Sequence, residues 1–301
     1  MFNITILGNN SAVQAYGRNP TSQFLQAGQL GMLIDCGEGT QNQLNRFKVK
    51  PGKITHIFIS HLHGDHYFGL IGLLTSMSLL GRIPDLHLYG PKALMDIIQL
   101  QLQVSESSLN FTLHFHPLEQ EDIILQTENI EVSCFKVNHK IECWGFLFKE
   151  KKKKRSIDIA KAMSFGVPSS FYNNLQNGED YIHPKGTIVA NEELTLPGSA
   201  PRCYAFCADT LFDRKIIDKI KGVDLLYHET TYLKDHEDKA LLRYHSTTHQ
   251  AATIALEAGV KKLMIGHFSS KYESVQPFLE EAREVFDNTI LAIEGSCVKI
   301  G

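Results

Sequence analysis

The chain has 301 residues, of which 43% are hydrophobic and 21% are charged. This length and composition supply enough apolar material for a full globular core without help from cross-links. The formal net charge of −3 excludes a uniformly basic surface, so any binding to nucleic acid must depend on a local patch.

Neither the first residues nor the cysteines indicate export or a membrane. The segment Met1–Gly8 has no basic stretch followed by a long apolar run and a cleavage site, and no later stretch reads as an apolar, bilayer-spanning helix. The six cysteines are scattered, and none forms the C-x-x-C pair of a zinc finger or redox motif. We expect a cytoplasmic protein with reduced cysteines and no membrane contact.

Strands and helices are expected to alternate along most of the chain. In the first half, the expected strands are Phe2–Leu7, Gly31–Gly37, Thr55–Ser60, Leu86–Tyr89, Phe111–His116 and Ile130–Val137, and the expected helices are Gly39–Phe47, Gly69–Leu80 and Lys92–Leu100. In the last third, the expected strands are Tyr204–Cys207, Leu225–His228, Lys262–Ile265 and Thr289–Ile293, and the expected helices are His249–Ala258 and Val275–Phe286. This alternation indicates the α/β class.

Between residues 150 and 200 the composition changes to that of an inserted arm. A basic run, Lys151-Lys152-Lys153-Lys154-Arg155, opens the segment, and turn-forming groups such as Gly166-Val167-Pro168 and Pro184-Lys185-Gly186 follow. We expect residues 1–301 to form a single domain with an arm at residues 150–200. A lysine run is alternatively a solvated face without a partner.

The densest group of metal-binding residues follows the expected strand Thr55–Ser60. The motif His61-x-His63-x-Asp65-His66 places four potential ligands in six residues, and we expect Gly64 to provide the sharp turn that brings them together. Imidazole nitrogens and carboxylate oxygens are ligands for zinc and manganese. The alternative, an exposed histidine-rich loop, does not explain why the motif directly follows a buried strand.

Three further candidates each follow an apolar strand. They are His139 after Val137, Asp209 after Cys207, and His267 after Ile265. Each alone reads as a cap or a surface residue. Their repeated position at strand ends, where a rigid element can direct them to one point, favours a shared site.

These motifs together resemble the metallo-β-lactamase superfamily, and within it the ribonuclease Z family. The resemblance spans nearly the whole chain and also includes Ile34-Asp35-Cys36-Gly37-Glu38-Gly39-Thr40-Gln41, Tyr227-His228-Glu229-Thr230-Thr231-Tyr232, His245-Ser246-Thr247 and Gly266-His267-Phe268-Ser269-Ser270. It implies an αββα sandwich of two mixed β-sheets flanked by helices, with an inserted tRNA-binding arm.

The resemblance implies two Zn²⁺ ions per subunit, with Mn²⁺ as the alternative. One ion is held by His61, His63, His139 and Asp209, and the other by Asp65, His66, Asp209 and His267, so that Asp209 bridges them. A water or hydroxide between two ions about 3.5–4 Å apart is a nucleophile at neutral pH. The implied reaction is in-line phosphodiester hydrolysis.

The resemblance also implies three catalytic residues. Asp65 orients or deprotonates the water, while His245, supported by Glu229, acts at the leaving 3′-oxygen. From the residues alone, His245 reads as a helix-start residue and Glu229 as a surface carboxylate. His228 is a candidate for orienting a ligand. The remaining histidines are expected to be structural or superficial: His56, His87, His114, His116, His183, His236 and His249.

The implied function is removal of the 3′ trailer from precursor tRNA, leaving a 3′-hydroxyl on the tRNA and a 5′-phosphate on the trailer. Substrate binding is expected from the arm, through Lys151, Lys152, Lys153, Lys154, Arg155, Gly166 and Pro168. The family usually forms homodimers in which the arm of one subunit serves the active site of the other.

Two alternatives to this function stay open. A hydrolase with the same fold, acting on a small phosphodiester or another ester, does not need the arm. A metal-bound, catalytically silent RNA-binding or scaffold protein is the second alternative, and it has no use for Asp65 and His245 beside a full ligand set.

Overall fold

The computed structural model describes residues 2–301, which divide into two compact units. Unit 1 contains the residues through Gln126 together with Ile130–Lys149 and Arg202–Gly301. Unit 2 contains Thr127–Asn129 and Glu150–Pro201. No helix among residues 2–301 is long and apolar enough to cross a membrane.

Unit 1 is built on two seven-stranded mixed sheets. In the first sheet the order is β18 (Cys297–Lys299), β1 (Phe2–Gly8), β2 (Ser22–Ala27), β3 (Leu30–Ile34), β4 (Ile54–Phe58), β5 (Leu86–Pro91) and β6 (Leu113–Leu118). In the second sheet the order is β17 (Thr289–Leu291), β16 (Leu263–Gly266), β15 (Leu225–Glu229), β14 (Cys203–Cys207), β9 (Trp144–Glu150), β8 (Ile130–Lys136) and β7 (Ile123–Gln126). Strands β3 to β6 are parallel, as are β14 to β17, whereas β18–β1, β1–β2, β2–β3, β14–β9 and β8–β7 pair in antiparallel fashion.

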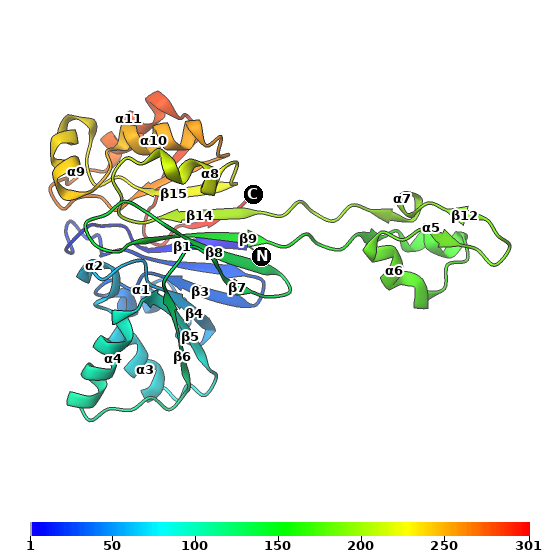
Figure 1. Ribbon diagram of the computed structural model, residues 1–301, viewed down its shortest axis with the longest axis horizontal. Coiled ribbons are helices and arrows are strands. Elements are labelled where there is room, and N and C mark those ends of the chain that lie inside the picture. The colour runs from blue at the N-terminus through cyan, green and yellow to red at the C-terminus, as the bar shows by residue number, and fades with distance from the viewer. Residues whose placement is uncertain (1) are drawn as a thin grey trace. The chain divides into compact units, whose positions relative to one another are not determined.

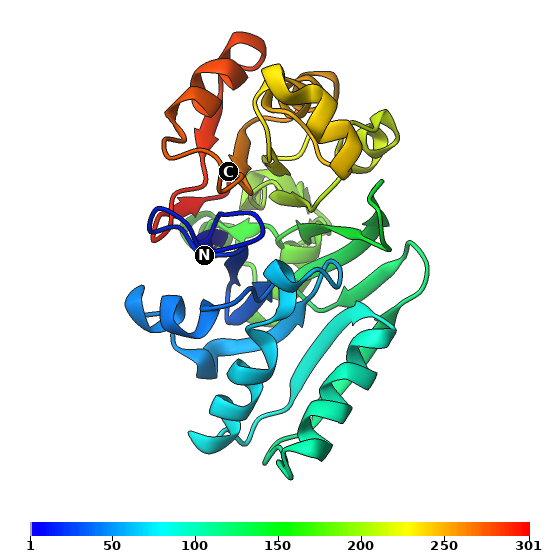
Figure 2. The ribbon, with the colours of Figure 1, turned by 90° about the vertical axis from the view of Figure 1, so that its left-hand side faces the viewer.

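Helices accompany both sheets (Figure 1, Figure 2). Those between strands of the first sheet are α1 (Thr40–Arg46), α2 (Gly64–Tyr67), α3 (Leu70–Leu79) and α4 (Ala93–Val104). Those between strands of the second sheet are α8 (Ile217–Ile220), α9 (Glu237–Arg243), α10 (Thr248–Glu257) and α11 (Gln276–Val285). Short 3-10 helices lie at Pro51–Lys53, Arg214–Ile216 and Lys234–His236. The expectation of two mixed sheets with flanking helices is confirmed.

The strand β4 shows why both faces of the first sheet are buried. Successive side chains of a strand point to opposite faces. Phe58 therefore packs in the core shared with the second sheet, whereas Ile57 and Ile59 pack in the core that includes α1, α3 and α4. A strand buried on both faces is continuously apolar, and its rigid end can hold side chains in fixed positions.

Unit 2 has a small core of its own. Its helices are α5 (Ile159–Ser164), α6 (Tyr172–Asn177) and α7 (Asn191–Leu194), with a 3-10 helix at Ser169–Phe171. Two strand pairs, β10 (Ser156–Ile157) with β13 (Thr195–Leu196) and β11 (Tyr181–Ile182) with β12 (Ile188–Val189), complete it. The buried side chains are Ala162, Val167, Leu175, Tyr181, Val189 and Leu194.

Most expected elements lie within a few residues of their predicted bounds, but four strands of the two large sheets, β2, β7, β9 and β18, were not predicted. β2 contains Gln23 and Gln26, and β9 follows the loop after His139. In β2, the polar Gln23 is fully buried and its side-chain carbonyl accepts a hydrogen bond from the Tyr204 hydroxyl. Alternation of polarity therefore gave no signal for β2, because a polar residue occupies a buried position.

Candidate metal centre

The motif of residues 61–66 lies where β4 leads into α2. His61 and His63 occupy the loop after β4, and Asp65 and His66 lie in the single turn of α2. His61 and His66 are fully buried, with exposed fractions of 0% and 1%. The loop carries the two histidines to the edge of the sheet, and the turn of helix directs the other two ligands to the same place.

Gly64 has a different role from the one expected. It begins α2 and does not have a positive φ, so the chain enters the helix here without a backbone conformation that only glycine adopts. A Cβ atom at this position would lie 2.2 Å from the Phe68 ring. The close approach of the exposed Phe68 ring therefore favours glycine here, because a larger residue would force the ring to move.

The three candidates at strand ends come from three different strands. His139 lies in the loop after β8, Asp209 lies two residues after β14, and His267 directly follows β16. His267 has a φ of 61°, in the left-handed region that non-glycine residues rarely adopt. Backbone strain of this kind is typical of functional sites, where the surrounding structure holds the residue in place.

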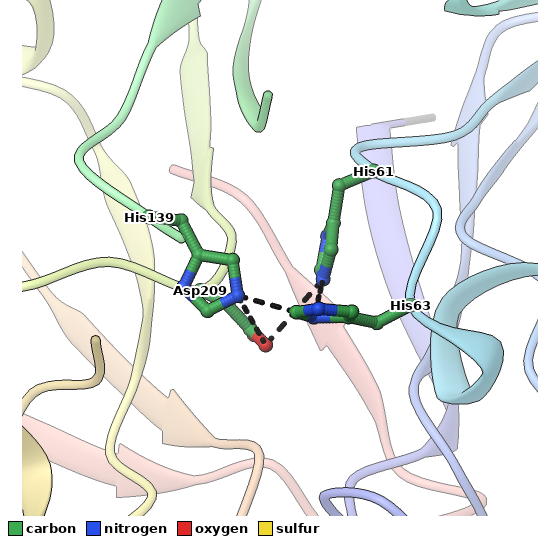
Figure 3. A group of neighbouring side chains, drawn as sticks. All are labelled: His61, His63, His139 and Asp209. Carbon is green, nitrogen blue, oxygen red and sulfur yellow. Dashed lines mark hydrogen bonds and ion pairs between the residues drawn. The ribbon is translucent and has the colours of Figure 1, made fainter. Parts of the chain in front are cut away.

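Within residues 2–301, eight side chains form overlapping groups that could hold metal ions. In one group, the ligand atoms of His61, His63, His139 and Asp209 lie within 4.8 Å of one another (Figure 3). A second group contains Asp65, His66 and His267, and a third contains Asp209, His245 and His267. The structure thus brings together all the residues that were expected to bind metal.

Asp209 lies between the two sides of this centre. Its Oδ2 is 3.6 Å from Nε2 of His61 and 3.9 Å from Nε2 of His139. Its Oδ1 is 3.4 Å from Nε2 of His66 and 3.2 Å from Nε2 of His267. Oδ1 is buried and accepts no hydrogen bond within residues 2–301. One carboxylate therefore faces two sets of ligands, with one oxygen for each.

The histidine nitrogens that face one another cannot all carry protons. Nδ1 of His63 lies 3.1 Å from Nε2 of both His61 and His139. Nδ1 of His139 donates to the Tyr244 carbonyl at 2.8 Å, so in the neutral ring Nε2 has a free lone pair. Converging lone pairs beside a buried carboxylate oxygen are the donor set that a divalent cation requires. The residues present fit a dinuclear metal centre.

The charge balance of the pocket agrees with this fit. Burial lowers the pKa of His61, His63 and His139 below the usual value, which favours the neutral form that has a lone pair. Burial also opposes the charged form of His66, but Asp209 and the other nearby carboxylates raise its pKa well above the usual value. The buried carboxylates thus favour positive charge at this position.

His245 and Glu229 form a pair at the edge of the centre. Nδ1 of His245 lies 3.1 Å from Oε1 of Glu229, which is the last residue of β15. Oε1 also accepts the main-chain N–H groups of Ser246 at 2.8 Å and Thr210 at 3.2 Å. Burial alone would lower the pKa of His245, but the Glu229 carboxylate raises it to about 9. Glu229 is therefore a buried, fixed partner for His245.

The centre opens into a pocket of about 480 Å³. Its wall includes Asp65 and His245, together with Ser11, Ala12 and Val13 from the loop after β1. The main-chain N–H of Ala12, which has a φ of 64°, donates to Oδ2 of Asp65 at 2.7 Å. Asp65 is thus held at the pocket wall by a backbone donor.

Several residues that orient the histidines were not predicted. Oδ2 of Asp35 accepts hydrogen bonds from Nδ1 of His66 at 2.7 Å and from the Ser60 hydroxyl at 2.9 Å. The Ser60 hydroxyl is in turn 3.0 Å from Nδ1 of His61. Thr231 lies beside His267 and His245. Asp35 and Thr231 belong to recognised motifs, but their spacing in the sequence does not say which ring nitrogen they contact.

The other predicted residues lie elsewhere. His228 has its Nδ1 2.7 Å from the Glu229 carbonyl and belongs to none of the ligand groups. The residues expected to bind substrate are in unit 2, where Lys152, Lys153 and Lys154 are exposed. Nε of Arg155 donates to Thr195. Gly166 and Pro168 are exposed on either side of the buried Val167.

Comparison with known proteins gives a family model that matches the first part of the chain and relatives that match nearly all of it. Residues 2–164 match a family model described as Anti-Pycsar protein Apyc1. Over 301 residues the chain is 42% identical to a protein named ribonuclease Z from Bacteroides fragilis, and the match covers 99% of each chain.

Solved structures agree with the sequence relatives. The short form of human tRNase Z matches with a TM-score of 0.73 and 26% identity, over 99% of each chain. A metallo-β-lactamase-fold protein from Bacillus subtilis, YhfI, matches with a TM-score of 0.70 and 19% identity, over 99% of this chain and 100% of that one. The second likeness concerns the fold alone.

Proposed function

The chain belongs to the ribonuclease Z family, with the metallo-β-lactamase fold, and we propose that it removes the 3′ trailer of precursor tRNA. The reaction is hydrolysis of one phosphodiester bond, which leaves a 3′-hydroxyl on the tRNA and a 5′-phosphate on the trailer. The observation that carries the hydrolytic chemistry is the position of Asp209, whose two oxygens face two separate sets of ligand atoms, and the full-length similarity to ribonuclease Z supports precursor tRNA as the substrate. We place the reaction in the cytoplasm.

The proposed centre holds two Zn²⁺ ions, with Mn²⁺ as the alternative, because both accept nitrogen and oxygen ligands. When bound, the ions polarise the scissile phosphate and lower the pKa of a water molecule, so that it can attack at neutral pH. One ligand set is His61, His63, His139 and Asp209, and the other is Asp65, His66, Asp209 and His267. Asp209 belongs to both sets because each of its oxygens faces a different one.

Asp65 is proposed to orient the attacking water and to receive its proton. Its carboxylate lies on the pocket wall, 3.3 Å from Nε2 of His267 through Oδ2. The N–H of Ala12 fixes the same oxygen. A carboxylate held in this way needs little reorganisation when the water approaches.

His245 is proposed to act on the leaving 3′-oxygen of the tRNA. Its Nδ1 faces Glu229, which leaves Nε2 as the nitrogen available for donation to substrate, and the residue lines the pocket. Glu229 stabilises the protonated ring, so that a proton is ready for the oxygen as the bond breaks. Glu229 is thus a positioning partner that acts through His245.

Unit 2 is proposed to be the arm that binds tRNA away from the cut. Its exposed Lys152 and Lys153 place positive charge on a unit with its own core, and contacts between lysines and phosphates add salt-sensitive affinity. We also propose a homodimer in which the arm of one subunit serves the active site of the other. Gly166 and Pro168, both exposed, are further candidates for contact with the tRNA.

The main alternative is a hydrolase of small phosphodiesters with the same centre. Residues 2–164 also belong to the family that the Apyc1 model describes, and this segment contains only the first part of the ligand set. Replacing Glu150–Pro201 by a short Gly-Ser loop separates the two functions. The loop can be short because Lys149 and Cys203 are paired neighbours on β9 and β14. The proposed function predicts loss of tRNA cleavage, whereas the alternative predicts full activity on a small phosphodiester.

The direct test is cleavage of a 3′-extended precursor tRNA by the purified protein, with and without a chelator, followed by mapping of both new ends. We expect one metal-dependent cut beside the discriminator base, with a 3′-hydroxyl on the tRNA. Absence of cleavage by protein with two bound ions per chain would contradict the proposal. Two bound ions without activity on precursor tRNA or on a small phosphodiester would favour the metal-bound, silent RNA-binding alternative.

A further inference from the structure

The hydroxyl group of Thr231 lies among three groups of the centre and faces no solvent. Thr231 is 2% exposed, and its Oγ1 is 2.7 Å from Oε2 of Glu229. The same oxygen is 3.0 Å from Nδ1 of His267 and 3.1 Å from Nδ1 of His245. One hydroxyl thus touches two histidines of the centre and the carboxylate beside them.

The direction of each hydrogen bond follows from counting protons. A threonine hydroxyl has one proton to donate and can accept two hydrogen bonds. Glu229 already accepts the main-chain N–H groups of Thr210, Thr231 and Ser246, which identifies it as an acceptor. The Thr231 proton therefore belongs to the short contact with Oε2. The hydroxyl oxygen is left to accept from the two histidines.

We propose that Thr231 is a positioning residue that fixes His267 in the tautomer with the proton on Nδ1, leaving the lone pair of Nε2 for a metal ion. The inference rests on the proposed function only in assigning a metal ion to this centre. Nε2 of His267 lies 3.2 Å from Oδ1 of Asp209 and 3.3 Å from Oδ2 of Asp65. A proton on Nε2 would donate to Asp209 and block the ligand position.

His267 depends on this hydroxyl more than His139 and His66 depend on their partners. Nδ1 of His139 faces a main-chain carbonyl, and Nδ1 of His66 faces the Asp35 carboxylate. Both partners can only accept a hydrogen bond, so they fix the tautomer by themselves. A hydroxyl can also donate, and it fixes the tautomer of His267 only because Glu229 takes its proton. Thr231 and Glu229 therefore act as one unit.

Ser60 and Asp35 form a similar unit on the first sheet. The Ser60 hydroxyl donates to Oδ2 of Asp35 and lies 3.0 Å from Nδ1 of His61. The centre thus contains a pairing of a buried hydroxyl with a buried carboxylate on each sheet. Hydrogen-bond partners of this kind change metal affinity by about 10- to 100-fold when they are removed.

The test compares Thr231→Val with Thr231→Ser and with the control Thr230→Val. Thr230 is adjacent and fully buried, but its hydroxyl donates to the Gly266 carbonyl and touches no histidine. Bound zinc is measured during competition with a chelator, because this readout needs no RNA. We expect Thr231→Val to release one of two ions about 10- to 100-fold more readily. Thr231→Ser and Thr230→Val should retain both ions with the affinity of the original protein.

Wild-type affinity for both ions in folded Thr231→Val would overturn the inference. Equal losses in Thr231→Val and Thr230→Val would also overturn it, because they would indicate a general packing effect. If Thr231→Val does not fold, the ¹⁵N spectrum of histidines in the zinc-loaded original protein decides. A proton on Nδ1 of His267 supports the inference, and a proton on Nε2 contradicts it.

These outcomes are separate from those of the proposed function. A protein that binds two ions and shows the expected effect at Thr231, but does not cut precursor tRNA, would sustain the inference and contradict the function. A protein that cuts precursor tRNA and retains both ions in Thr231→Val would sustain the function and contradict the inference.

Discussion

Unit 1 contains two groups of neighbouring histidines that differ in how their rings are arranged. One belongs to the metal centre, and the other forms a ladder on the first sheet, consisting of His56, His87, His114 and His116. In the ladder, the rings of His56 and His87 are stacked 4.9 Å apart with an angle of 14°. In the centre, the rings of His61 and His63 are 4.8 Å apart but nearly perpendicular, at 82°.

The position on the strand explains the difference. His56, His87 and His114 are register partners within β4, β5 and β6, so their side chains leave the sheet side by side. The residues of the centre lie beyond strand ends, where the backbone can turn each ring separately. Within residues 2–301, the ladder contains no group of three ligand atoms close enough for a metal ion. A metal centre therefore requires convergence as well as proximity.

Replacing Asp209 by Ala should have the largest effect, because it removes the group shared by both ligand sets. Several kcal/mol of transition-state stabilisation depend on the two ions, so we expect kcat to fall by about 10⁴-fold and bound metal to decrease. Cleavage kinetics and metal analysis provide the measurement. The control is His87→Ala in the ladder, which should retain both ions and full activity. Equal effects of the two substitutions would remove the distinction between the groups.

Replacing His245 by Ala should leave metal binding intact but slow the reaction. His245 lies at the edge of the centre, where its Nδ1 is 3.9 Å from Oδ2 of Asp209 and 3.1 Å from Glu229. Loss of a general acid lowers the rate by about 10²- to 10⁴-fold. We expect kcat to fall while zinc content and KM for precursor tRNA stay close to the original values. Near-normal turnover would exclude His245 from catalysis.

The lysines of unit 2 can show whether tRNA binding depends on where a positive charge lies or only on net charge. Lys154 donates to Asn173 within the unit, whereas Lys152 and Lys153 are exposed. Replacing Lys152 and Lys153 by Ser should weaken tRNA binding by about tenfold and reduce the salt slope by about 0.7–0.9 per lost phosphate contact. The matched control replaces Lys50 and Lys53, which precede β4 and so lie at the opposite end of this strand from the centre.

Binding measured over a series of salt concentrations separates the outcomes. Equal effects of the two double variants would show that only net charge matters. An unchanged slope for the variant at Lys152 and Lys153 would remove these residues from the interface.

The sequence predicted the centre better than it predicted the groups that hold it. His139, Asp209 and His267 could be found because each follows an apolar strand, and parallel strands such as β14 and β16 end at the same edge of a sheet. The contacts of Asp35 and Thr231 could not be found in this way. They depend on which ring nitrogen faces which oxygen, and spacing along the chain does not determine this.

The strands show a similar limit. Runs rich in apolar and β-branched residues identified β4 and β14, whose residues are buried almost throughout. β2 was missed because its buried Gln23 is stabilised by a hydrogen bond from Tyr204, which lies 181 positions away. A long-range partner of this kind has no local signal in the sequence.

The smallest expected effect concerns the free energy of unfolding of the protein at acid pH, to which His56 of the ladder contributes. Burial, together with His87 and His116, lowers the pKa of His56 to about 4. In the unfolded chain the pKa of histidine is about 6.5, so between these values the unfolded state binds the additional proton. The stabilisation is complete above pH 6.5 and decreases as the pH falls towards 4, by at most about 1.4 kcal/mol per pH unit.

Replacing His56 by Gln removes this group while keeping a side chain that can accept a hydrogen bond from the Thr55 hydroxyl, which lies 2.8 Å from Nδ1 of His56. The free energy of unfolding, measured in urea between pH 7 and 4.5, should depend less on pH in the variant. The difference between the two proteins isolates His56, because the carboxylates and the histidines of the centre are common to both. Identical pH dependence would mean that the ladder opens enough to admit the proton without unfolding.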